Sequence, residues 1–384
     1  MRKDWEYKKL GEVAFYPNDK ISVDKIGANH YVGVENLLKD KAGILFSDQL
    51  PNAATATCFK YNDILLGNIR PYLKKIWLSN TEGGASGDVI VIRTSSDNIL
   101  PNYLFKLLSS DKFFNYFNLY TKGAKMPRGD KNAIAKFIVP TPPKPTQLAI
   151  VAELDKINEL IQLKKQQLKD YDQLAQSIFY EMFGDPVENE KGWEKSELKN
   201  NVKEMFLGPF GSSLKIDSYV PKEMSYCMVY EQKHAIKGNI HLDNHYITEE
   251  KYNSLKRFTV LPGDFIMSCR GTIGKLYQLP PNAPLGIIHP SLMKIRIRDE
   301  KYNATFFKFL LIPIIANEQT NGNCVQMAIT AKALGNKKLP LPPLPLQQQF
   351  AARIEAIERQ KQQVSETIKD LETLLASRMQ YWFD

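Results

Sequence analysis

The sequence has 384 residues, 43% of them hydrophobic, which is enough apolar material for two cored domains and argues against a disordered or fibrous protein. Lysine and arginine outnumber aspartate and glutamate by 51 to 42. The net charge of +9 favours a polyanionic partner, although an ordinary basic soluble protein would show the same balance.

The cysteines and the first residues of the chain bear on its compartment. Cys58, Cys227, Cys269 and Cys324 are scattered without a CxxC pair, so neither a zinc site nor a disulfide framework is indicated. The opening stretch MRKDWEYKKL lacks the apolar core of a signal peptide, and no apolar run approaches the ~20 residues of a membrane span. We therefore expect a soluble, cytoplasmic protein that does not engage a membrane.

Residues 1–145 are expected to form an α+β domain. The run DVIVIR at 88–93 predicts a strand, and the pattern at 102–117 predicts a helix. Within YNDILLGNIRPYLKKIWL, which starts at Tyr61, Asp63 suits a turn because aspartate bonds its own backbone. The apolar run after this turn leads into a loop with Arg70, then into lysines and a second apolar run.

A proline-dense run, PTPPKPTQLAI, follows at 140–150. Proline lacks the N–H group and biases its predecessor to extended geometry, so this run predicts a stiff hinge, neither helix nor central strand. The polar segment 147–183 beyond it has no proline or glycine and predicts a long helix, which we place in the spacer 146–184.

Apolar residues recur along this helix at alternating spacings of three and four, broken only by Lys164. Such spacing indicates a coiled-coil seam. The seam residues are Leu154, Ile157, Ile161, Leu168, Tyr171 and Ile178. A helix of ~36 residues would be roughly 50 Å long, which one compact domain could hardly enclose. The alternative is an amphipathic helix packed on its own domain.

The second half repeats the first. Gly, Pro, Asp and Asn cluster at 184–192 as a linker, and a second α+β domain is expected over 185–345. The stretch LPGDFIMSCRGTIGKLYQL from Leu261 matches the one from Tyr61, with Asp264 at the turn and Arg270 in the loop. A strand is predicted at 293–298 and a helix at 304–316.

The hinge and the long helix also recur, 200 positions later. PLPPLPLQQQF at 340–350 repeats four prolines and Gln147, now Gln347, and 346–384 is the second spacer helix. Its seam keeps the same heptad phase with Lys361 and Arg378 as polar interruptions. The seam residues are Ile354, Ile357, Val364, Ile368, Leu371 and Leu375.

Motifs of a DNA-handling enzyme are mostly missing. There is no GxxxxGK[ST] loop for ATP and no methyl-transfer signature around any Pro-Pro pair. His241 and His245 lack the glutamate of HExxH and fit a solvated turn better than a metal site. Asp217, Glu231 and Lys233 could imitate a nuclease site, but a surface charge cluster explains them better.

The glycine-rich stretch GPFGSSLK at 208–215 has neither the GxGxxG order nor an evident preceding strand. We interpret it as a flexible loop that presents backbone N–H groups, two serine hydroxyls and Lys215 to phosphates.

With these hinges, helices and loops, and with FGDP at 183–186, the sequence resembles the specificity subunit of type I restriction-modification systems over essentially its whole length. Family members have two variable target-recognition domains, each followed by a PPL.EQ-like hinge and a long helix. The hinges here read PPKPTQ and PPLPLQ, so Thr146 and Leu346 replace the acidic residue. The loss of this acidic residue affects the expected cap at the start of each helix more than it affects the resemblance to the family.

The resemblance implies an α+β protein with an internal pseudo-two-fold repeat, in which the two spacer helices form an antiparallel coiled coil with one recognition domain at each end. It implies double-stranded DNA as a ligand, and methyltransferase and restriction or motor subunits as partners. Methyl donor, ATP and magnesium would be held by those partners, so this chain would be non-catalytic, with no cofactor or metal of its own.

Basic and hydroxyl side chains in the loops are the candidate DNA contacts, because lysine and arginine bind phosphates while other side chains read base edges. They are Arg70, Tyr72, Lys74, Lys75, Lys122, Lys125, Arg128, Lys131, Ser212, Ser213, Lys215, Arg270, Thr272 and Lys275. A target of two unlike half-sites is expected because the two sets of loops differ. The alternatives are a stand-alone nuclease or methyltransferase, and a coiled-coil scaffold without a role on DNA.

Overall fold

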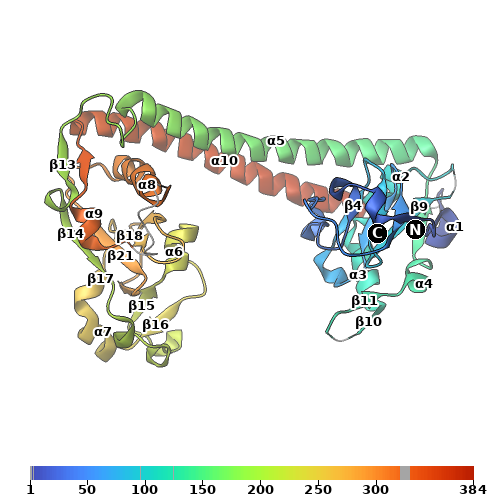
Figure 1. The fold of residues 1–384 in the computed structure, drawn as a ribbon, viewed down its shortest axis with the longest axis horizontal. Coiled ribbons are helices and arrows are strands. Elements are labelled where there is room, and N and C mark those ends of the chain that lie inside the picture. Colours follow the sequence, from blue (N-terminus) through green and yellow to red (C-terminus); the bar gives the residue numbers. More distant parts are fainter. Residues whose placement is uncertain (1, 3, 96, 124, 321–328) are drawn as a thin grey trace. The chain divides into compact units, whose positions relative to one another are not determined.

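The computed structural model of the chain describes residues 2, 4–95, 97–123, 125–320 and 329–384. The chain forms two compact units (Figure 1). The first comprises Met1–Gln166 and Ser365–Asp384, and the second comprises Gln167–Val364. Each unit therefore combines one globular domain with parts of both long helices. Cys324 lies outside the described residues.

The first unit contains two four-stranded sheets and two strand pairs, ordered β2-β9-β6-β7, β3-β5-β8-β4, β1-β12 and β10-β11. Its strands are β1 (Glu6–Lys9), β2 (Ala14–Phe15), β3 (Lys20–Ser22), β4 (Tyr31–Val32), β5 (Thr55–Phe59), β6 (Ile64–Gly67), β7 (Ile76–Leu78), β8 (Gly83–Ala85), β9 (Val89–Thr94), β10 (Thr121–Lys122), β11 (Arg128–Gly129) and β12 (Ile138–Thr141). Its short helices are α1 (Leu10–Val13), α2 (Pro101–Leu108), α3 (Asp111–Leu119) and α4 (Lys131–Ile134).

Strand β6 is buried on both faces, which explains its unbroken apolar sequence. Ile64 and Leu66 face one core, which α2 and α3 complete. Leu65, on the opposite face, joins Phe59 and Trp77 in a second core against the other sheet. Successive side chains of a strand point to opposite faces, so one run of residues serves both cores.

The second unit repeats this plan with sheets β14-β21-β18-β19 and β16-β15-β20-β17 and the pair β13-β22. Its strands are β13 (Lys195–Glu197), β14 (Val202–Leu207), β15 (Cys227–Tyr230), β16 (His245–Ile247), β17 (Thr259–Val260), β18 (Phe265–Ser268), β19 (Leu276–Gln278), β20 (Gly286–Ile288), β21 (Leu292–Ile297) and β22 (Lys338–Pro340). Its short helices are α6 (Gln232–Lys237), α7 (Glu249–Leu255), α8 (Ala304–Thr320) and α9 (Ala331–Gly335).

The two domains share a frame but differ at a sheet edge. In both, two parallel strands, β4 with β8 and β15 with β20, are flanked by an antiparallel strand, β5 or β17. The fourth strand, however, lies on opposite edges, with β3 beside β5 and β16 beside β15. The predicted α+β class and internal repeat are confirmed, and this edge is where the repeat diverges.

Two sequence predictions about local structure need correction. The single helix expected at 102–117 is two helices, α2 and α3, because Ser110 caps the second by accepting a hydrogen bond from Phe113 N at 3.2 Å. A strand does precede GPFGSSLK: β14 ends at Leu207, although the sequence there shows no evident strand pattern. Among the described helices, none combines the length and apolar character needed to cross a bilayer.

The long helices are α5 (Lys144–Phe183) and α10 (Leu344–Phe383). The last proline of each run, Pro145 or Pro345, belongs to the first turn of its helix and not to the hinge as expected. Proline is tolerated there because the first helical N–H groups have no intrahelical acceptor.

The repeated glutamines fix the start of both helices. Gln147 is fully buried; its Oε1 accepts from Leu100 N at 2.9 Å, and its Nε2 donates to Asn98 O and Pro142 O, both at 2.8 Å. Gln347 makes the same three bonds with Asn303 N, Lys301 O and Pro342 O. Each glutamine therefore ties the hinge to its own domain, which accounts for its recurrence in the sequence.

The two long helices run antiparallel within each unit. In the first unit Lys165 pairs with Glu372 at 2.8 Å, and Arg378 pairs with Glu153. In the second, Lys361 pairs with Asp172 at 2.7 Å, and Phe350 packs on Phe179 and Phe183. Every residue of the predicted seam is buried or half-buried. Two polar interruptions, Lys361 and Arg378, are thus ion-paired to the opposite helix.

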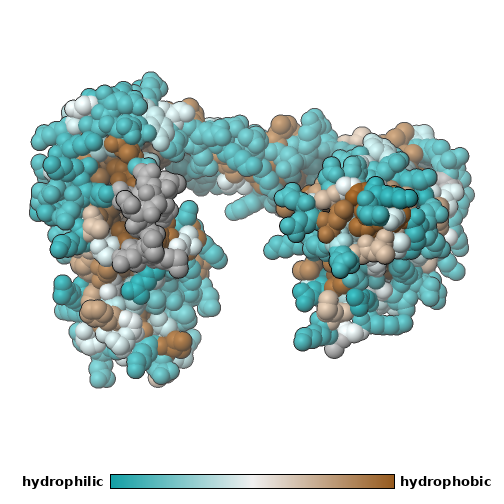
Figure 2. All heavy atoms as spheres, viewed as in Figure 1, coloured by the Kyte–Doolittle hydropathy of each residue, from teal (hydrophilic) through white to brown (hydrophobic). Residues whose placement is uncertain are grey.

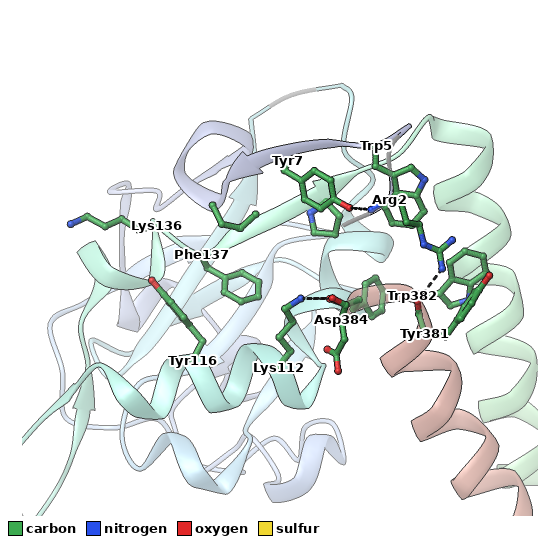
Figure 3. A pocket seen from close by; sticks show the side chains of 13 residues that line it. Arg2, Trp5, Tyr7, Lys112, Tyr116, Lys136, Phe137, Tyr381, Trp382 and Asp384 are labelled. Carbon is green, nitrogen blue, oxygen red and sulfur yellow. Dashed lines mark hydrogen bonds between the residues drawn. The ribbon is translucent and has the colours of Figure 1, made fainter.

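The end of α10 is bound to the first domain around a cavity of about 380 Å³ (Figure 3). Arg2 lies over the rings of Trp5, Tyr381 and Trp382 at 4.4–4.7 Å, and the two tryptophans stack. Lys112 Nζ donates to Phe383 O at 2.7 Å. Phe383 itself is buried in the core of the first unit, so the last turn of α10 is part of that core.

Candidate nucleic-acid interface

The loop between β6 and β7 carries four of the candidate DNA contacts. It spans residues 68–75, and both Arg70 and Lys74 have left-handed backbone, with φ of 52° and 49°. The equivalent loop between β18 and β19 is one residue shorter and has glycines there, Gly271 at 64° and Gly274 at 80°. Our sequence match of Arg70 with Arg270 was therefore wrong, because Arg70 takes the place of Gly271.

Having Arg70 and Lys74 where the second domain has glycines costs the first domain conformational free energy. A left-handed conformation costs a residue with a side chain of order 1 kcal/mol, whereas glycine adopts it freely. The first domain keeps Arg70 and Lys74 in spite of this cost. Strained residues cluster at functional sites, and the strain is a reason to regard these side chains as functional.

The four side chains of the loop do not all point to solvent. Arg70 and Tyr72 are exposed, the latter at 55%. Lys74 pairs with Asp111 at 2.7 Å, and Lys75 Nζ donates to Val34 O at 2.6 Å. Arg70 and Tyr72 are therefore the better placed pair to meet a ligand, while Lys74 and Lys75 also hold the loop in place.

The second basic loop of the first domain, TKGAKMPRGDK at 121–131, lies beside the β6–β7 loop. Arg70 N donates to Pro127 O at 2.8 Å, and Ile69 forms a bridge with Arg128. Arg128 pairs with Asp88 at 3.0 Å and Lys122 with Asp130 at 3.0 Å. The bond from Lys122 holds the pKa of Asp130 below its usual range. Lys125 and Lys131 are exposed, and the backbone contacts at Pro127 and Arg128 bring the two loops together.

In the second domain, the loop 208–215, for which we expect flexibility, is anchored at both ends. Gly208 lies so close to His289 that a Cβ would be 2.2 Å from His289 O, and Leu214 is buried at the other end. Between these anchors lies a 3-10 turn, Gly211–Ser213. Ser212 and Lys215 are exposed and Ser213 is half-buried.

The β18–β19 loop presents Arg270, Thr272 and Lys275, all exposed. Gln232 at the start of α6 holds it, since its Nε2 donates to Arg270 O at 2.5 Å and to Thr272 O at 3.3 Å. Burial lowers the pKa of His289, and the charge of Arg270 acts in the same direction. The carbonyl oxygen of His289 lies close to Gly208 of the other loop.

The residues that resembled a nuclease site have other roles. Glu231 pairs with Lys233 at 2.8 Å and with His245 at 2.9 Å, and His245 stacks on Tyr219. Although burial opposes it, bonding to Lys233 and His245 lowers the pKa of Glu231. Asp217 and His241 are exposed. Within the described ranges no three His, Cys, Asp or Glu side chains are grouped to hold a metal ion.

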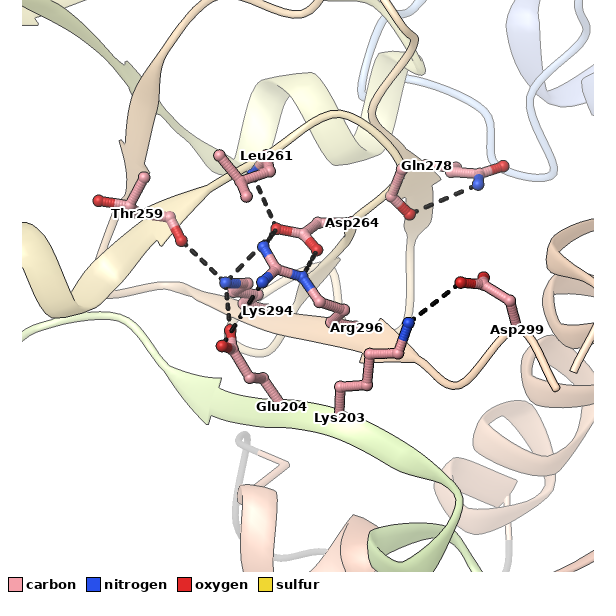
Figure 4. Close-up of polar contacts among 10 residues, drawn as sticks. Lys203, Glu204, Thr259, Leu261, Asp264, Gln278, Lys294, Arg296 and Asp299 are labelled. Atoms are coloured by element: carbon pink, nitrogen blue, oxygen red, sulfur yellow. Dashed lines mark hydrogen bonds and ion pairs between the residues drawn. The ribbon is translucent and has the colours of Figure 1, made fainter. Parts of the chain in front are cut away.

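Buried ion pairs lie at the ends of β6 and β18 opposite to these loops, and the sequence did not reveal them. Asp63 and Asp264 make the expected turn bonds, to Lys60 N and Leu261 N at 2.7 Å. Each also binds an arginine of the neighbouring strand, Arg93 or Arg296. The second domain adds Lys294, 3% exposed, which binds Glu204 (Figure 4).

The repeated plan and the family comparisons agree. The model of the family described as type I restriction modification DNA specificity domain matches residues 2–170 and 222–373. The MjaX specificity subunit of a type I restriction enzyme from Methanocaldococcus jannaschii is 26% identical over 97% of this chain and 93% of its own length. The MjaVIII specificity subunit of the same organism is 22% identical, over 97% of this chain and 92% of its length.

Solved structures show the same fold. One chain, from a study of complex assembly and conformational transition of the type I R-M system, aligns with a TM-score of 0.68 at 23% identity, covering 100% of this chain and 98% of that one. The S subunit of a type I system from M. genitalium aligns with a TM-score of 0.51 at 12% identity, covering 98% and 95%.

Proposed function

The chain belongs to the type I restriction-modification DNA specificity family, and on that basis we propose that it is the DNA-recognition subunit of a type I restriction-modification complex. The observation that carries the proposal is the repeat. Two domains share one frame of strands, and each presents basic and hydroxyl side chains on loops that differ between them. Such a protein suits a target of two unlike half-sites.

Each domain would bind DNA in two ways. Lysine, arginine and serine groups would bind phosphates and fix the position of the domain, while a few side chains would reach base edges in a groove. In the first domain Arg70 and Tyr72 are the best placed, and Lys125 and Lys131 are exposed as well. In the second these are Ser212, Lys215, Arg270, Thr272 and Lys275.

The chain would carry out no chemistry itself. Methyl donor, ATP and Mg²⁺ would be bound by methyltransferase and restriction or motor subunits. The long helices are the proposed docking surface, and Figure 2 shows hydrophilic residues over most of their visible face, with hydrophobic residues in between. On α5, Leu160, Leu163 and Leu174 remain exposed. At about 100° per residue they fall within roughly 60° of each other, a stripe that a partner helix could cover.

A domain exchange tests the proposal. The chain is purified from its host together with any methyltransferase subunit that binds it, and methylated sites are mapped in host DNA. Replacing residues 201–337 by the matching segment of a relative keeps the β13-β22 pair and should change one half-site only. Replacing 10–137, inside the β1-β12 pair, should change the other. Independent reading would be refuted if either exchange altered both half-sites.

The long helices would set the distance between half-sites. Four residues inserted after Leu168, and four after Thr367, lie between the ion pairs Lys165–Glu372 and Asp172–Lys361. They lengthen both helices by ~6 Å, nearly two base pairs at ~3.4 Å each, and cause only a stutter in the seam. Methylation maps should show the same half-sites with a longer spacer. An active insert with an unchanged spacer would refute this part of the proposal.

A further inference from the structure

Phe210 has the most exposed large hydrophobic side chain among the described residues, at 86%. A single exposed apolar residue is common on protein surfaces, so the exposure alone decides nothing. What distinguishes Phe210 is the way in which the chain holds it out.

The backbone on both sides of Phe210 is fixed. Gly208 N donates to Leu292 O at 2.9 Å, and Pro209 is buried. Ser213 N donates to Phe210 O at 2.8 Å, which closes the 3-10 turn, and Leu214 is buried with Cys227 and Val229. On the neighbouring Gly211, an added Cβ would have no atom within 4 Å. Phe210 therefore projects from a supported loop, with open space at the neighbouring Gly211.

The exposed groups on this loop and on the β18–β19 loop suit a nucleic acid better than a protein. The two loops leave the same end of one sheet, since Gly208 N donates to Leu292 O and Cys269 N to Ser291 O. Ser212, Lys215, Arg270 and Lys275 are exposed on them, and such groups bind phosphates. Protein interfaces, by contrast, are depleted in lysine at their centres. An apolar side chain flanked by phosphate-binding groups is the arrangement by which proteins wedge apart stacked bases.

The matching segment of the first domain, which the structure describes in full, holds no such feature. Only Tyr16, Pro17, Asn18 and Asp19 lie between β2 and β3, and Tyr16 is turned inward to donate its hydroxyl hydrogen to Lys131 O at 3.1 Å. A wedge would therefore act on one half of the target alone.

We propose that Phe210 inserts between two adjacent base pairs of the half-site read by the second domain, unstacking that step and bending the duplex there. The inference rests on the proposed function, since it assumes that this domain reads DNA. Burying a phenyl ring in this way should strengthen binding without any phosphate contact, so its contribution should not depend on salt.

The test uses the full chain reconstituted with its methyltransferase, and duplexes of the mapped target with 2-aminopurine at successive positions. Apart from the bases that the methyltransferase itself flips out for methylation, fluorescence should rise at one step of the second half-site and at none in the first. Phe210→Ala should abolish the rise and weaken binding about tenfold or more. Phe210→Leu should retain part of both effects. Met224→Ala, at a residue 69% exposed in the same domain but outside the loop, is the matched control and should change neither.

The salt dependence separates the wedge from its neighbours. Phe210→Ala should leave the slope of log affinity against log salt unchanged, whereas Lys215→Ala should reduce it by about one. Wild-type affinity for Phe210→Ala, or no unstacked step, overturns the wedge while leaving sequence-specific binding, and with it the proposed function, intact. If Phe210→Ala instead lost the methyltransferase and the chain alone still bound DNA normally, Phe210 would belong to a protein interface and the inference would be wrong.

Discussion

The ion pair between Lys294 and Glu204 in the second domain can be replaced by the apolar residues Val and Phe, which the first domain has at the corresponding positions. Glu204 pairs with Arg296 in the second domain as Phe15 pairs with Arg93 in the first, so Glu204 corresponds to Phe15. Lys294, two residues before Arg296, then corresponds to Val91, two residues before Arg93. Lys294 Nζ lies 2.5 Å from Glu204, 2.9 Å from Thr259 O and 3.4 Å from Asp264. We expect Lys294→Val with Glu204→Phe to restore the first-domain arrangement.

The single changes should be the harmful ones. Lys294→Val leaves Glu204 and Asp264 with Arg296 as their remaining cation, and Glu204→Phe leaves the 3% exposed Lys294 with less compensation. Removing one partner should lower the free energy of unfolding by ~1–3 kcal/mol. This is less than the loss expected for a fully buried ion pair, because Glu204 is 42% exposed. The double variant should lie within about 1 kcal/mol of the wild type, since replacing both charges by packed apolar groups is often neutral.

Calorimetry and urea unfolding of the full chain measure these differences. A loss of 1 kcal/mol should lower the Tm of a unit of this size by about 2–4 °C. Val91→Lys with Phe15→Glu in the first domain is the reverse control, and it too should be better tolerated than either single change. If the double variant lost as much stability as the two single variants together, the charges would not be coupled and the reasoning would fail.

Three further predictions follow from contacts described above. The hydrogen bond from Lys294 lowers the pKa of Glu204 in the folded chain. The ion pair therefore stabilises the fold above the ordinary glutamate pKa of about 4.3, and this stabilisation is lost as the pH falls through the lower folded pKa. Between pH 7 and pH 3 the free energy of unfolding should fall less in the Lys294→Val, Glu204→Phe double variant than in the wild type. Gln347→Leu, which removes three buried hydrogen bonds, should destabilise the chain by ~2–4 kcal/mol in urea unfolding, more than exposed Gln360→Leu. Arg70→Gly should raise Tm by relieving left-handed strain yet weaken DNA binding and its salt dependence, and unchanged binding would exclude Arg70 from the interface.

The sequence predicted the features that depend on long, regular patterns. The seam from Leu154 to Ile178 and its copy could be found because helical spacing repeats over many turns, and the hinges because proline restricts the backbone locally. The glutamines were recognised as repeated, but their role was hidden. The acceptors of Gln147, Asn98 O and Pro142 O, are main-chain atoms, which carry no sequence signal.

The missed elements depend on partners distant in the sequence. Strand β14 reads VKEMFL, and its charges conceal the apolar alternation because Glu204 is matched by Lys294 and Arg296, some 90 residues away. The basic loops could be singled out by composition, whereas the left-handed backbone of Arg70 and the inward bond of Lys75 could not. That these loops contact DNA stays a prediction.

The second unit lies between the two segments of the first unit in the sequence, and this determines the order in which the units can fold during synthesis. The second unit, Gln167–Val364, is one continuous stretch, but the core of the first unit includes Phe383. At 5–20 residues per second, the first domain must wait about 10–40 s for the intervening ~200 residues before α10 reaches it. During that time Leu154, Ile157 and Ile161 have no partner helix, so a nascent or truncated first domain should self-associate through this stripe or require a chaperone.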